Sequence, residues 1–514
     1  MSADYDVVVV GGGHNGLVAS CYLAKAGKRV LVLEKESVLG GAAISTRAFE
    51  GVDARLSRYS YLVSLLPDQI VRDLELEIEL APRRFGSFTP DASGERGLLI
   101  DKLDASVTKQ SFDELRASGD FDSWNDFYED TEKVARVLFP TVLQPLPTES
   151  EVRQILGEKL WKEFFVQPIG RTIEARFEND VVRGVVMTDA LIGTFASNHD
   201  KNLDANKCFL YHVIGNETGE WRIPVGGMGA VTGSMAKRAA ELGVDLLVSA
   251  QVTSVTADGK VTYLHGALEQ TVSAGHILAN VSRPTLERIM GGSGEHSIGG
   301  AQVKVNMVLK RLPKLRSGVD PVAAFGGTFH INESYSQLQT AFEQASRGEI
   351  PNPLPLEIYC HSLTDPSILG EGLRESGAQT LTVFALHTPH SLLSDADNDA
   401  MRARFEAAAI DSINSVLAED IRELLLTDAN GAPCIETKTT LDLEEALGLP
   451  GGNIFHAPLS WPFVSDGSKL DTPEKRWGVD SGYERIFFCG STARRGGAVS
   501  GIGGHNAAMA ILES

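Results

Sequence analysis

The segment that most constrains the fold lies at residues 6–16, where the chain reads DVVVVGGGHNG. A short apolar strand runs into a glycine turn, and an apolar-periodic helix starts directly after it. In this pattern Gly11 permits the tight turn, Gly13 lets the backbone approach a diphosphate, and Gly16 lets the helix pack closely on the strand. The N–H groups at the start of the helix are then free to bind an anion. The segment predicts the first half of a dinucleotide-binding β-α-β unit.

An acidic residue stands where such a unit needs one. Glu34 follows the second apolar run, residues 29–33, at the expected distance from the glycine turn. A carboxylate there can accept a hydrogen bond from a ribose 2′-OH and would repel a 2′-phosphate. We therefore expect FAD or NAD rather than NADP.

A second glycine-rich segment lies near the other end of the chain. A strand at residues 485–489 enters residues 490–506, and a helix of small residues follows. Bare backbone and a helix start can face the polar edge of a flavin; the alternative is that small residues only let the helix pack tightly. Two such units fit an FAD laid along one sheet, with the diphosphate at the first unit and the isoalloxazine ring at the second. A dehydrogenase that uses NAD alone does not need the second unit, so the cofactor we expect is FAD.

Composition narrows the class of partner. The chain has 514 residues and a net charge of −21, which argues against nucleic acid as a partner. Its five cysteines are widely scattered without a C-x-x-C pair, which argues against a metal site and against a redox disulfide. A strand begins within a few residues of Met1, and no apolar run approaches the roughly 18–20 residues of a membrane span. We expect a cytoplasmic protein that acts on an apolar small molecule. Peripheral contact with a membrane is possible but has no support in the sequence, and the oligomeric state is left open.

The nucleotide-type elements occur in three separated pieces. We predict an α/β fold with an FAD-binding domain built from residues 1–80, 221–300 and 451–514. Residues 81–220, which read as helical and charge-rich, and residues 301–450 would form an inserted α+β substrate or lid domain. The strand at residues 303–309 alternates, with Lys304 and Asn306 on one face. The apolar stretch 160–166 is either a lid or membrane-contacting patch, or simply part of the core.

The chain resembles a known family over essentially its whole length. The stretches that carry the likeness are residues 12–18, 39–43, 57–62, 188–193, 226–230 and 449–456. They are similar to those of the phytoene desaturase-type flavoproteins of the glutathione reductase-like FAD superfamily. Within it, the nearest subgroup that we identify is named for pyridine nucleotide-disulfide oxidoreductase domain-containing protein 2. The resemblance implies a glutathione reductase-like FAD-binding Rossmann domain.

One stretch departs from the family pattern. The subgroup usually has Ala-His-Pro-Gly-Gly after the last strand, whereas this chain has Ala-Arg-Arg-Gly-Gly at residues 493–497. Arg494 and Arg495 would bring two cations near the flavin, where they favour an anionic substrate or an anionic flavin. The alternative is a surface-exposed pair.

The resemblance implies an FAD-dependent dehydrogenase or desaturase that removes a hydride from a C–C bond. An amine-type oxidase acting on C–N bonds, a flavin-dependent isomerase and a flavin-holding interaction protein without turnover remain as alternatives. In each redox case the flavin supplies the difficult step, and the protein binds, orients and excludes water. No Ser-His-Asp or metal constellation is evident.

Residues at the site follow from the motifs and the resemblance together. Candidates for catalysis are Tyr61, Lys304 and His456. Lys304 is a candidate because, in similar amine-oxidising enzymes, a lysine on a substrate-domain strand holds a water by the flavin. His456 could accept a proton, because a histidine titrates near neutrality. The alternatives are a solvent-facing lysine and a core histidine. The residues expected to bind the cofactor are Gly11, Gly13, His14, Asn15, Gly16, Glu34, Lys35, Gly40, Gly41, Ala42, Tyr59, Ser60, Gly227, Met228, Val252, Gly490, Ser491, Gly497, Val499, Ser500, Gly501 and Asn506.

Overall fold

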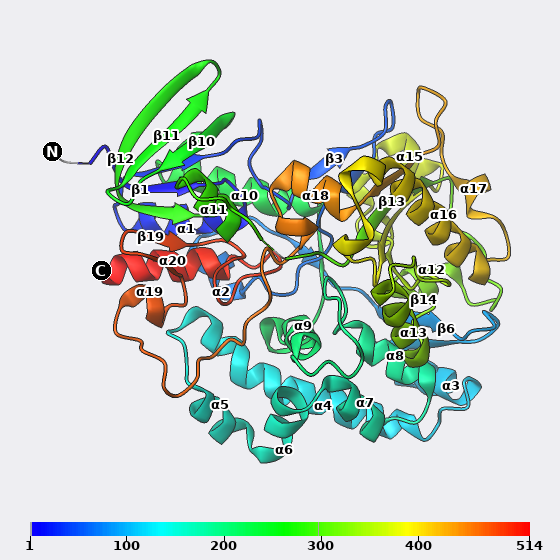
Figure 1. The fold of residues 1–514 in the computed structure, drawn as a ribbon. Helices are drawn as coiled ribbons and strands as arrows, with labels where there is room; N and C mark the ends of the chain where they lie inside the picture. The colour runs from blue at the N-terminus through cyan, green and yellow to red at the C-terminus, as the bar shows by residue number, and fades with distance from the viewer. Residues whose placement is uncertain (1–2, 297) are drawn as a thin grey trace.

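The fold is built around two sheets with a group of helices beneath them (Figure 1). The structure is a computed structural model that describes residues 3–296 and 298–514. Residues 1–2 and 297, which fall inside two of the predicted domain ranges, lie outside the described residues.

The first sheet has a parallel centre in the order β9-β2-β1-β12-β19. Its strands are β1 (Tyr5–Val10), β2 (Val30–Leu33), β9 (Asp245–Leu247), β12 (Leu268–Ala279) and β19 (Ile486–Phe488). The register pairs Val7 with Val30 on one side and with His276 on the other. The hairpin β10 (Ala250–Val255) and β11 (Lys260–His265) continues from β12, and β18 (Asp480–Tyr483) pairs with β19. These strands come from three distant parts of the chain, which brings both glycine-rich segments to one sheet.

Close helix packing supports this sheet. Helix α1 (His14–Lys25) lies against α20 (Ile502–Glu513) on one side and α10 (Met228–Glu241) on the other. At the α1–α20 crossing, a Cβ on Gly504 would lie 2.0 Å from the carbonyl oxygen of Asn15. The absence of a side chain there lets the two glycine-rich segments meet.

The second sheet has seven strands in the order β17-β13-β16-β15-β14-β6-β7. They are β17 (Ile435–Lys438), β13 (Val303–Leu309), β16 (Gln379–Ala385), β15 (Leu356–Tyr359), β14 (Thr328–Ile331), β6 (Phe85–Pro90) and β7 (Gly97–Asp101). The predicted strand at 303–309 is confirmed, but all seven of its residues are buried, so the solvent-facing alternative for Lys304 is wrong. The strand lies inside the sheet between β17 and β16, with both faces covered.

Two details of the helical region differ from the sequence prediction. Residues 85–90 and 97–101 form strands β6 and β7, because β6 pairs with β14, more than 200 residues later in the chain. Within the range 81–220, predicted to be helical, the helical stretch from residue 149 is also interrupted at Gly157, whose φ is +79°. The helices of this region are α3 (Ala105–Glu114), α4 (Asp120–Leu138), α5 (Glu149–Leu156), α6 (Glu158–Trp161), α7 (Ile169–Arg176), α8 (Asp180–Thr188) and α9 (Asp204–Val213), with a π-helical turn at Lys162–Val166.

The apolar stretch 160–166 belongs mainly to the core. Leu160, Trp161, Phe164 and Phe165 are buried, and the Trp161 and Phe165 rings stack at 4.7 Å and contact Phe463. The lid or membrane-contacting alternative is therefore wrong for these four side chains.

Shorter elements complete the chain. They are β3 (Ser45–Arg47), β4 (Arg55–Ser57), β5 (Leu80–Ala81), β8 (Ile223–Pro224), α2 (Asp68–Asp73), α11 (Arg283–Ile289), α12 (Pro321–Phe325), α13 (Tyr335–Ser346), α14 (His361–Thr364), α15 (Glu371–Glu375), α16 (Asn398–Val416), α17 (Ile421–Leu424), α18 (Thr440–Leu447) and α19 (Pro473–Arg476).

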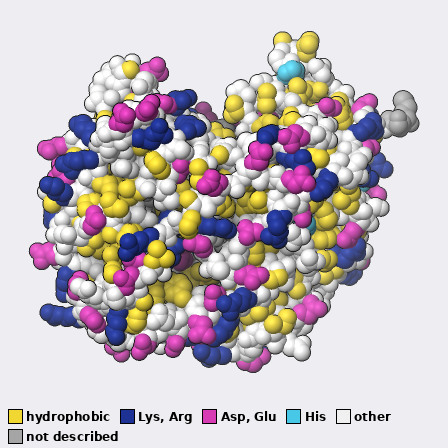
Figure 2. Space-filling view, turned by 180° about the vertical axis from the view of Figure 1, so that it is seen from behind, with side chains coloured by type: hydrophobic (Ala, Val, Ile, Leu, Met, Phe, Trp, Pro, Cys, Tyr) yellow, Lys and Arg dark blue, Asp and Glu magenta, His cyan; other side chains and the backbone are white. Residues whose placement is uncertain are grey.

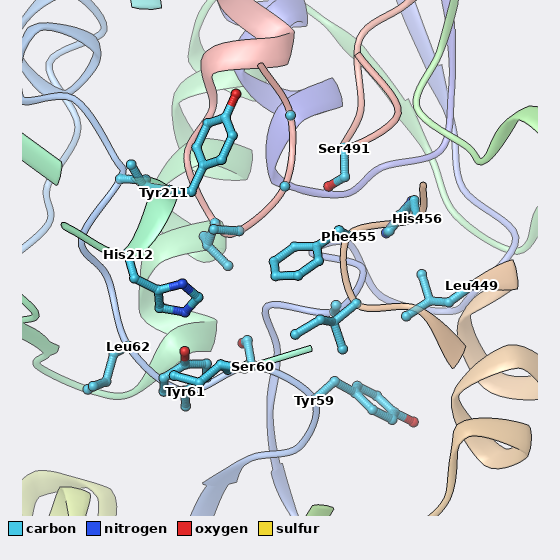
Figure 3. Close-up of a pocket in the computed structure, with 18 of the residues that line it drawn as sticks. Tyr59, Ser60, Tyr61, Leu62, Tyr211, His212, Leu449, Phe455, His456 and Ser491 are labelled. Atoms are coloured by element: carbon cyan, nitrogen blue, oxygen red, sulfur yellow. The ribbon is translucent and has the colours of Figure 1, made fainter. Parts of the chain in front are cut away.

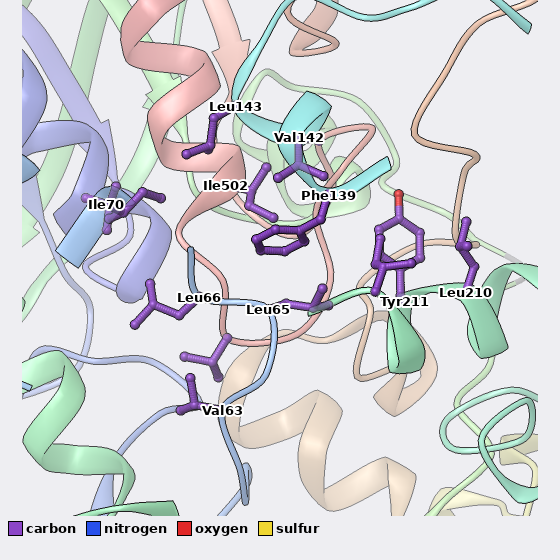
Figure 4. Packing of buried hydrophobic residues seen from close by; sticks show 14 of the residues in the cluster. Val63, Leu65, Leu66, Ile70, Phe139, Val142, Leu143, Leu210, Tyr211 and Ile502 are labelled. Carbon is purple, nitrogen blue, oxygen red and sulfur yellow. The ribbon is translucent and has the colours of Figure 1, made fainter. Parts of the chain in front are cut away.

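One apolar cluster joins the helices to the first sheet. Figure 4 shows Leu65 and Leu66 between Ile70 of α2, Phe139 at the end of α4, and Ile502 of α20. Burial of such side chains contributes about 1.5–3 kcal/mol each, so the helical region is firmly attached to the sheet. The outer face seen in Figure 2 carries Asp and Glu interspersed with Lys and Arg.

Candidate functional site

The glycine turn opens onto a cavity of about 470 Å³. Gly11 has a φ of +101°, and a Cβ there would lie 2.8 Å from the carbonyl oxygen of Asn280. The Asn280 side chain donates a hydrogen bond to the Gly11 carbonyl at 2.9 Å and fixes the turn. Gly13 caps α1 without a side-chain hydrogen bond, so the first N–H groups of the helix remain for another acceptor.

Glu34 lies in the wall of this cavity and also holds the turn together. Its carboxylate accepts hydrogen bonds from the backbone N–H groups of Gly12 at 2.7 Å and Glu36 at 2.9 Å. Burial raises the pKa of Glu34 above its usual value, although the two hydrogen bonds act to lower it. Because two carboxylate oxygens offer about four acceptor positions, Glu34 can still accept from a ribose hydroxyl.

Several predicted cofactor residues come together around this first cavity. Those that line it are Gly11, Gly13, His14, Asn15, Glu34, Lys35, Gly41, Ala42, Val252 and Ser491. Sequence reasoning missed Asn280, Ser282, Thr285, Arg288 and residues 446–449, which also line it. Asn280 directly follows a buried parallel strand, and that position could have identified it. Residues 446–449, at the end of α18 and just after it, give no such signal.

A second, smaller cavity of about 100 Å³ adjoins the first. His14, Ala42, Leu449, His456 and Ser491 line both. Figure 3 shows Phe455 in the middle of this region, with Tyr211 and His212 on one side and Leu449 and His456 on the other. Of the predicted residues, Tyr59, Ser60, Tyr61, Gly497 and Val499 also line it.

Apolar and aromatic side chains dominate the second cavity. Its wall includes Leu62, Leu65, Ile192, Trp221, Phe384, Leu443, Ile454, Phe455 and Leu459, and no Asp, Glu, Lys or Arg side chain lines it among the described residues. Tyr61 stacks on Trp221 with ring centroids 5.6 Å apart and packs against Phe384 at 4.8 Å. Burial raises the pKa of the Tyr61 hydroxyl well above its usual value, so this phenol stays protonated.

Two histidines stand where the cavities meet. Nε2 of His14 lies 3.1 Å from the carbonyl oxygen of Ala498, and His456 has a φ of +63°. In the described part of the chain, the buried Nδ1 of His456 has no hydrogen-bond partner. Burial lowers the pKa of each histidine to about 4. With its pKa lowered in this way, the His456 ring is neutral at pH 7, the form that can accept a proton, and its catalytic role stays a prediction.

Lys304 lines neither cavity. Its ammonium group is buried and donates hydrogen bonds to the carbonyl oxygens of Ser57 at 2.7 Å and Ser60 at 2.8 Å. Burial lowers the pKa of Lys304 to about 7. The structure thus places Lys304 behind the Tyr59–Tyr61 segment, where it fixes the backbone of that segment.

Eight predicted cofactor residues line neither cavity. They are Gly16, Gly40, Gly227, Met228, Gly490, Ser500, Gly501 and Asn506. Gly16 has the packing position expected of it, since a Cβ there would lie 2.5 Å from the Gly11 carbonyl oxygen. Asn506 donates to the Val142 carbonyl at 3.1 Å, which ties α20 to the helical region. These residues shape the walls from behind.

The two arginines of the departing stretch do not face the cavities. Arg495 is 2% exposed, and its guanidinium donates to the carbonyl oxygens of Thr141 and Gln144. Arg494 is partly buried and donates to the Phe463 carbonyl at 3.4 Å. The buried Arg495 therefore does not belong to an exposed surface pair, and neither arginine lines the two cavities.

The structure gives no sign of a reactive cysteine or of a metal centre among the described residues. All five cysteines are free and buried, and burial raises the pKa of Cys21 to about 12. No cluster of three or more His, Cys, Asp or Glu side chains suited to a metal ion occurs within residues 3–296 and 298–514. Over the same residues, none of the helices combines the length and the apolar character needed to cross a membrane.

Comparisons with known proteins agree with this geometry. A family model described as an NAD(P)-binding Rossmann-like domain matches residues 9–69. An uncharacterized protein of Mycobacterium tuberculosis, Rv0897c, is 50% identical over 99% of this chain and 97% of its own length. Pyridine nucleotide-disulfide oxidoreductase domain-containing protein 2 of Rattus norvegicus is 29% identical over 100% of this chain and 94% of its length.

Solved structures share the fold at low sequence identity. A mutant of putrescine oxidase superposes with a TM-score of 0.55 at 18% identity, covering 99% of both chains. Cyclohexylamine oxidase from Brevibacterium oxydans gives a TM-score of 0.51 at 14% identity, again covering 99% of both chains.

Proposed function

Because this chain belongs to the FAD oxidoreductase family that includes pyridine nucleotide-disulfide oxidoreductase domain-containing protein 2, we propose that it is an FAD-dependent dehydrogenase of the phytoene desaturase type. Its first sheet would then be a glutathione reductase-like FAD domain. The reaction that we propose oxidises a C–C single bond of an apolar small molecule to C=C. The C–H bond of one carbon breaks with transfer of its hydride to the flavin, and the adjacent carbon releases a proton to solvent. We further propose that the protein acts in the cytoplasm and has no nucleic-acid partner.

The described residues fit FAD at both cavities. The first N–H groups of α1 would bind the diphosphate, and Gly13, which lines the first cavity, would let the backbone approach it. Glu34 would accept from the adenosine ribose. The isoalloxazine ring would extend past His14 and Ser491, which line both cavities, toward Gly497. When bound, FAD supplies the hydride acceptor.

One observation carries the choice of substrate. The second cavity has aromatic and aliphatic walls, and the described residues place no Asp, Glu, Lys or Arg side chain in them. A charged group brought into such walls would lose its hydration without gaining an ion pair. The walls would exclude water and orient a neutral substrate, while the Tyr61 hydroxyl and the neutral His456 ring would provide polar groups among the lining residues.

An amine-type oxidase is the second candidate. The stacked Tyr61 and Trp221 rings favour it, since aromatic faces can attract a cation. The fold of putrescine oxidase is compatible with either candidate, because a likeness at 18% identity concerns the fold alone.

Anaerobic mixing tests the proposal. Purified FAD-loaded protein is mixed with neutral alkenes and cyclic alkanes in one series and with primary and secondary amines in a second series. The absorbance of the oxidised flavin is monitored in both. Bleaching by neutral compounds alone supports the proposal, and bleaching by amines alone supports the oxidase. Conversion without bleaching would indicate an isomerase, and no response to any compound would indicate a flavin-holding interaction protein. Protein that neither carries nor binds FAD would contradict the whole assignment.

A further inference from the structure

A third cavity, of about 300 Å³, lies on the other side of the loop that follows β19. Its wall is formed by the 460–470 segment, α19, the start of α11, and residues 492–494. In Figure 1, α11, β19 and α19 follow one another down the left side of the molecule. No residue of this cavity lines either of the two cavities assigned to FAD and substrate. It is thus a separate site.

Cations converge in this third cavity. Arg283, Lys469, Lys475 and Arg494 line it, and Asp480 is the one carboxylate among its described lining residues. This balance is opposite to that of the whole chain, whose net charge is −21. The hydroxyl-bearing residues Ser460, Ser468 and Thr492 also line the cavity.

Three of the four cations form no ion pair within 4 Å among the described residues, although Lys469 lies close enough to Asp471 to help lower the pKa of that carboxyl. Arg283 and Arg494 donate to backbone carbonyls, those of Ser481 at 3.3 Å and Phe463 at 3.4 Å, and Lys469 forms no ion pair. Only Lys475 has a partner, Asp471 at 3.0 Å. Arg494 is partly buried without a carboxylate partner, and this burial lowers its pKa. The free energy that the guanidinium loses on leaving water is therefore not compensated by an ion pair. An anion in the cavity would relieve that cost.

We propose that this third cavity binds a small oxyanion, of the phosphate or carboxylate type, at a site separate from the cofactor. Arginine presents a planar fork that matches both anions, and lysine adds a point charge. The volume lies at the low end of ordinary ligand pockets, which limits the occupant to a small molecule. Arg494 replaces the His of the family pattern, so this chain gains a cation where the family pattern has none that is permanently charged.

The site also explains the departure at Arg494 and Arg495. Arg495 donates a hydrogen bond to the backbone of the helical region, whereas Arg494 lines the third cavity. Thr492 and Arg494 lie on the loop that continues into Gly496 and Gly497 of the second cavity. An occupied third cavity would therefore brace the loop that borders the proposed flavin ring.

Calorimetric titration of FAD-saturated protein tests the proposal. The probes are inorganic phosphate, pyrophosphate and succinate at fixed ionic strength; FAD saturation keeps them out of the first cavity. We expect one saturable site, and the probe that binds most tightly identifies the oxyanion type. The variants Arg494→Gln and Lys469→Gln should each weaken that binding at least tenfold, whereas Lys109→Gln, at an exposed position on α3, should leave it unchanged.

Two outcomes would overturn the proposal. One is the absence of saturable binding of all three probes to wild-type protein. The other is binding that Arg494→Gln and Lys469→Gln leave within twofold of wild type, because such binding would lie elsewhere. Arg494→His, which restores the family residue, should weaken binding at pH 8 more than at pH 5.5, since an accessible imidazole loses its charge between these values. Neither the probes nor these variants report on flavin reduction, so the result is independent of the proposed reaction.

Discussion

The ammonium nitrogen of Lys304 lies 2.8 Å from the carbonyl oxygen of Ser60, so a central strand of the second sheet holds the segment that borders the second cavity. The same nitrogen lies 2.7 Å from the Ser57 carbonyl oxygen. Through this one buried side chain, the second sheet contacts the end of β4 and the loop that follows it. Its consequences for stability can be measured directly.

Lys304→Met should lower the free energy of unfolding by about 1–3 kcal/mol at pH 8, since it leaves buried carbonyl oxygens without a donor. The pH dependence gives a sharper test. The pKa of Lys304 is about 7 in the folded protein, against about 10.4 when unfolded. Between these values the unfolded chain binds more protons, so wild-type stability relative to Lys304→Met should rise with pH. Urea titrations from pH 7 to 10 measure this; a flat difference between the two proteins would contradict it.

Glu34→Gln should weaken FAD binding about ten- to hundredfold. The amide keeps the shape of the side chain but offers one acceptor oxygen where the carboxylate offers two. A hydrogen bond to a charged group contributes about 1.5–3 kcal/mol, and about 1.4 kcal/mol corresponds to a tenfold change in Kd. Fluorescence titration of apo-protein with FAD gives the Kd. The matched control is Glu95→Gln, at an exposed position in the turn between β6 and β7. Equal losses of FAD affinity in both variants would argue against the role of Glu34.

Gly504→Ala should lower the free energy of unfolding by about 1–3 kcal/mol, the usual range for overpacking. The new Cβ would lie 2.0 Å from the Asn15 carbonyl oxygen, so α20 must move away from α1. Gly233→Ala provides the contrast, because Gly233 is exposed on α10 and nothing lies within 4 Å of its added Cβ. That control should gain about 0.5–1 kcal/mol from reduced backbone freedom. Thermal and chemical unfolding of both variants should therefore shift in opposite directions.

Arg495→Met should destabilise the fold by about 1–3 kcal/mol without changing the flavin spectrum. The guanidinium donates to the carbonyl oxygens of Thr141, Gln144 and Trp477, all outside the two cavities. Arg404→Met, at an exposed position on α16, should change stability little. Should the Arg495 variant alter the absorbance of bound FAD while keeping wild-type stability, the sequence expectation of a flavin-side cation would have to be restored.

His456→Asn should remove part of the acid sensitivity of the fold. The pKa of His456 is about 4 when folded, against about 6.5 when unfolded. The unfolded chain therefore binds the extra proton first, and wild-type stability falls as the pH falls from about 6.5 to 4. This group accounts for about 3 kcal/mol over that window, at 1.36 kcal/mol per pKa unit. Guanidinium titrations across the window, with exposed His265→Asn as control, should show a shallower pH slope only for the His456 variant.

The sequence by itself determined the nucleotide-binding half of the protein. The strand, glycine turn, helix start and Glu34 are local features, and their backbone demands can be read from residue types. The position of Gly11, with its φ of +101°, needs no knowledge of distant residues. The same holds for the strand Val303–Leu309, whose alternating pattern predicted it, although the burial of both its faces did not follow from that pattern.

Only the tertiary structure decided which side chains share a cavity and which charges are exposed. Lys304, Arg494 and Arg495 are chemically similar in the sequence, yet one fixes a loop, one lines a separate cavity and one binds backbone carbonyls. Burial and long-range partners set those roles, and neither is encoded in local spacing. The glycine turn could therefore indicate the cofactor, but the apolar second cavity required segments from residues 14 to 499 to fold around it.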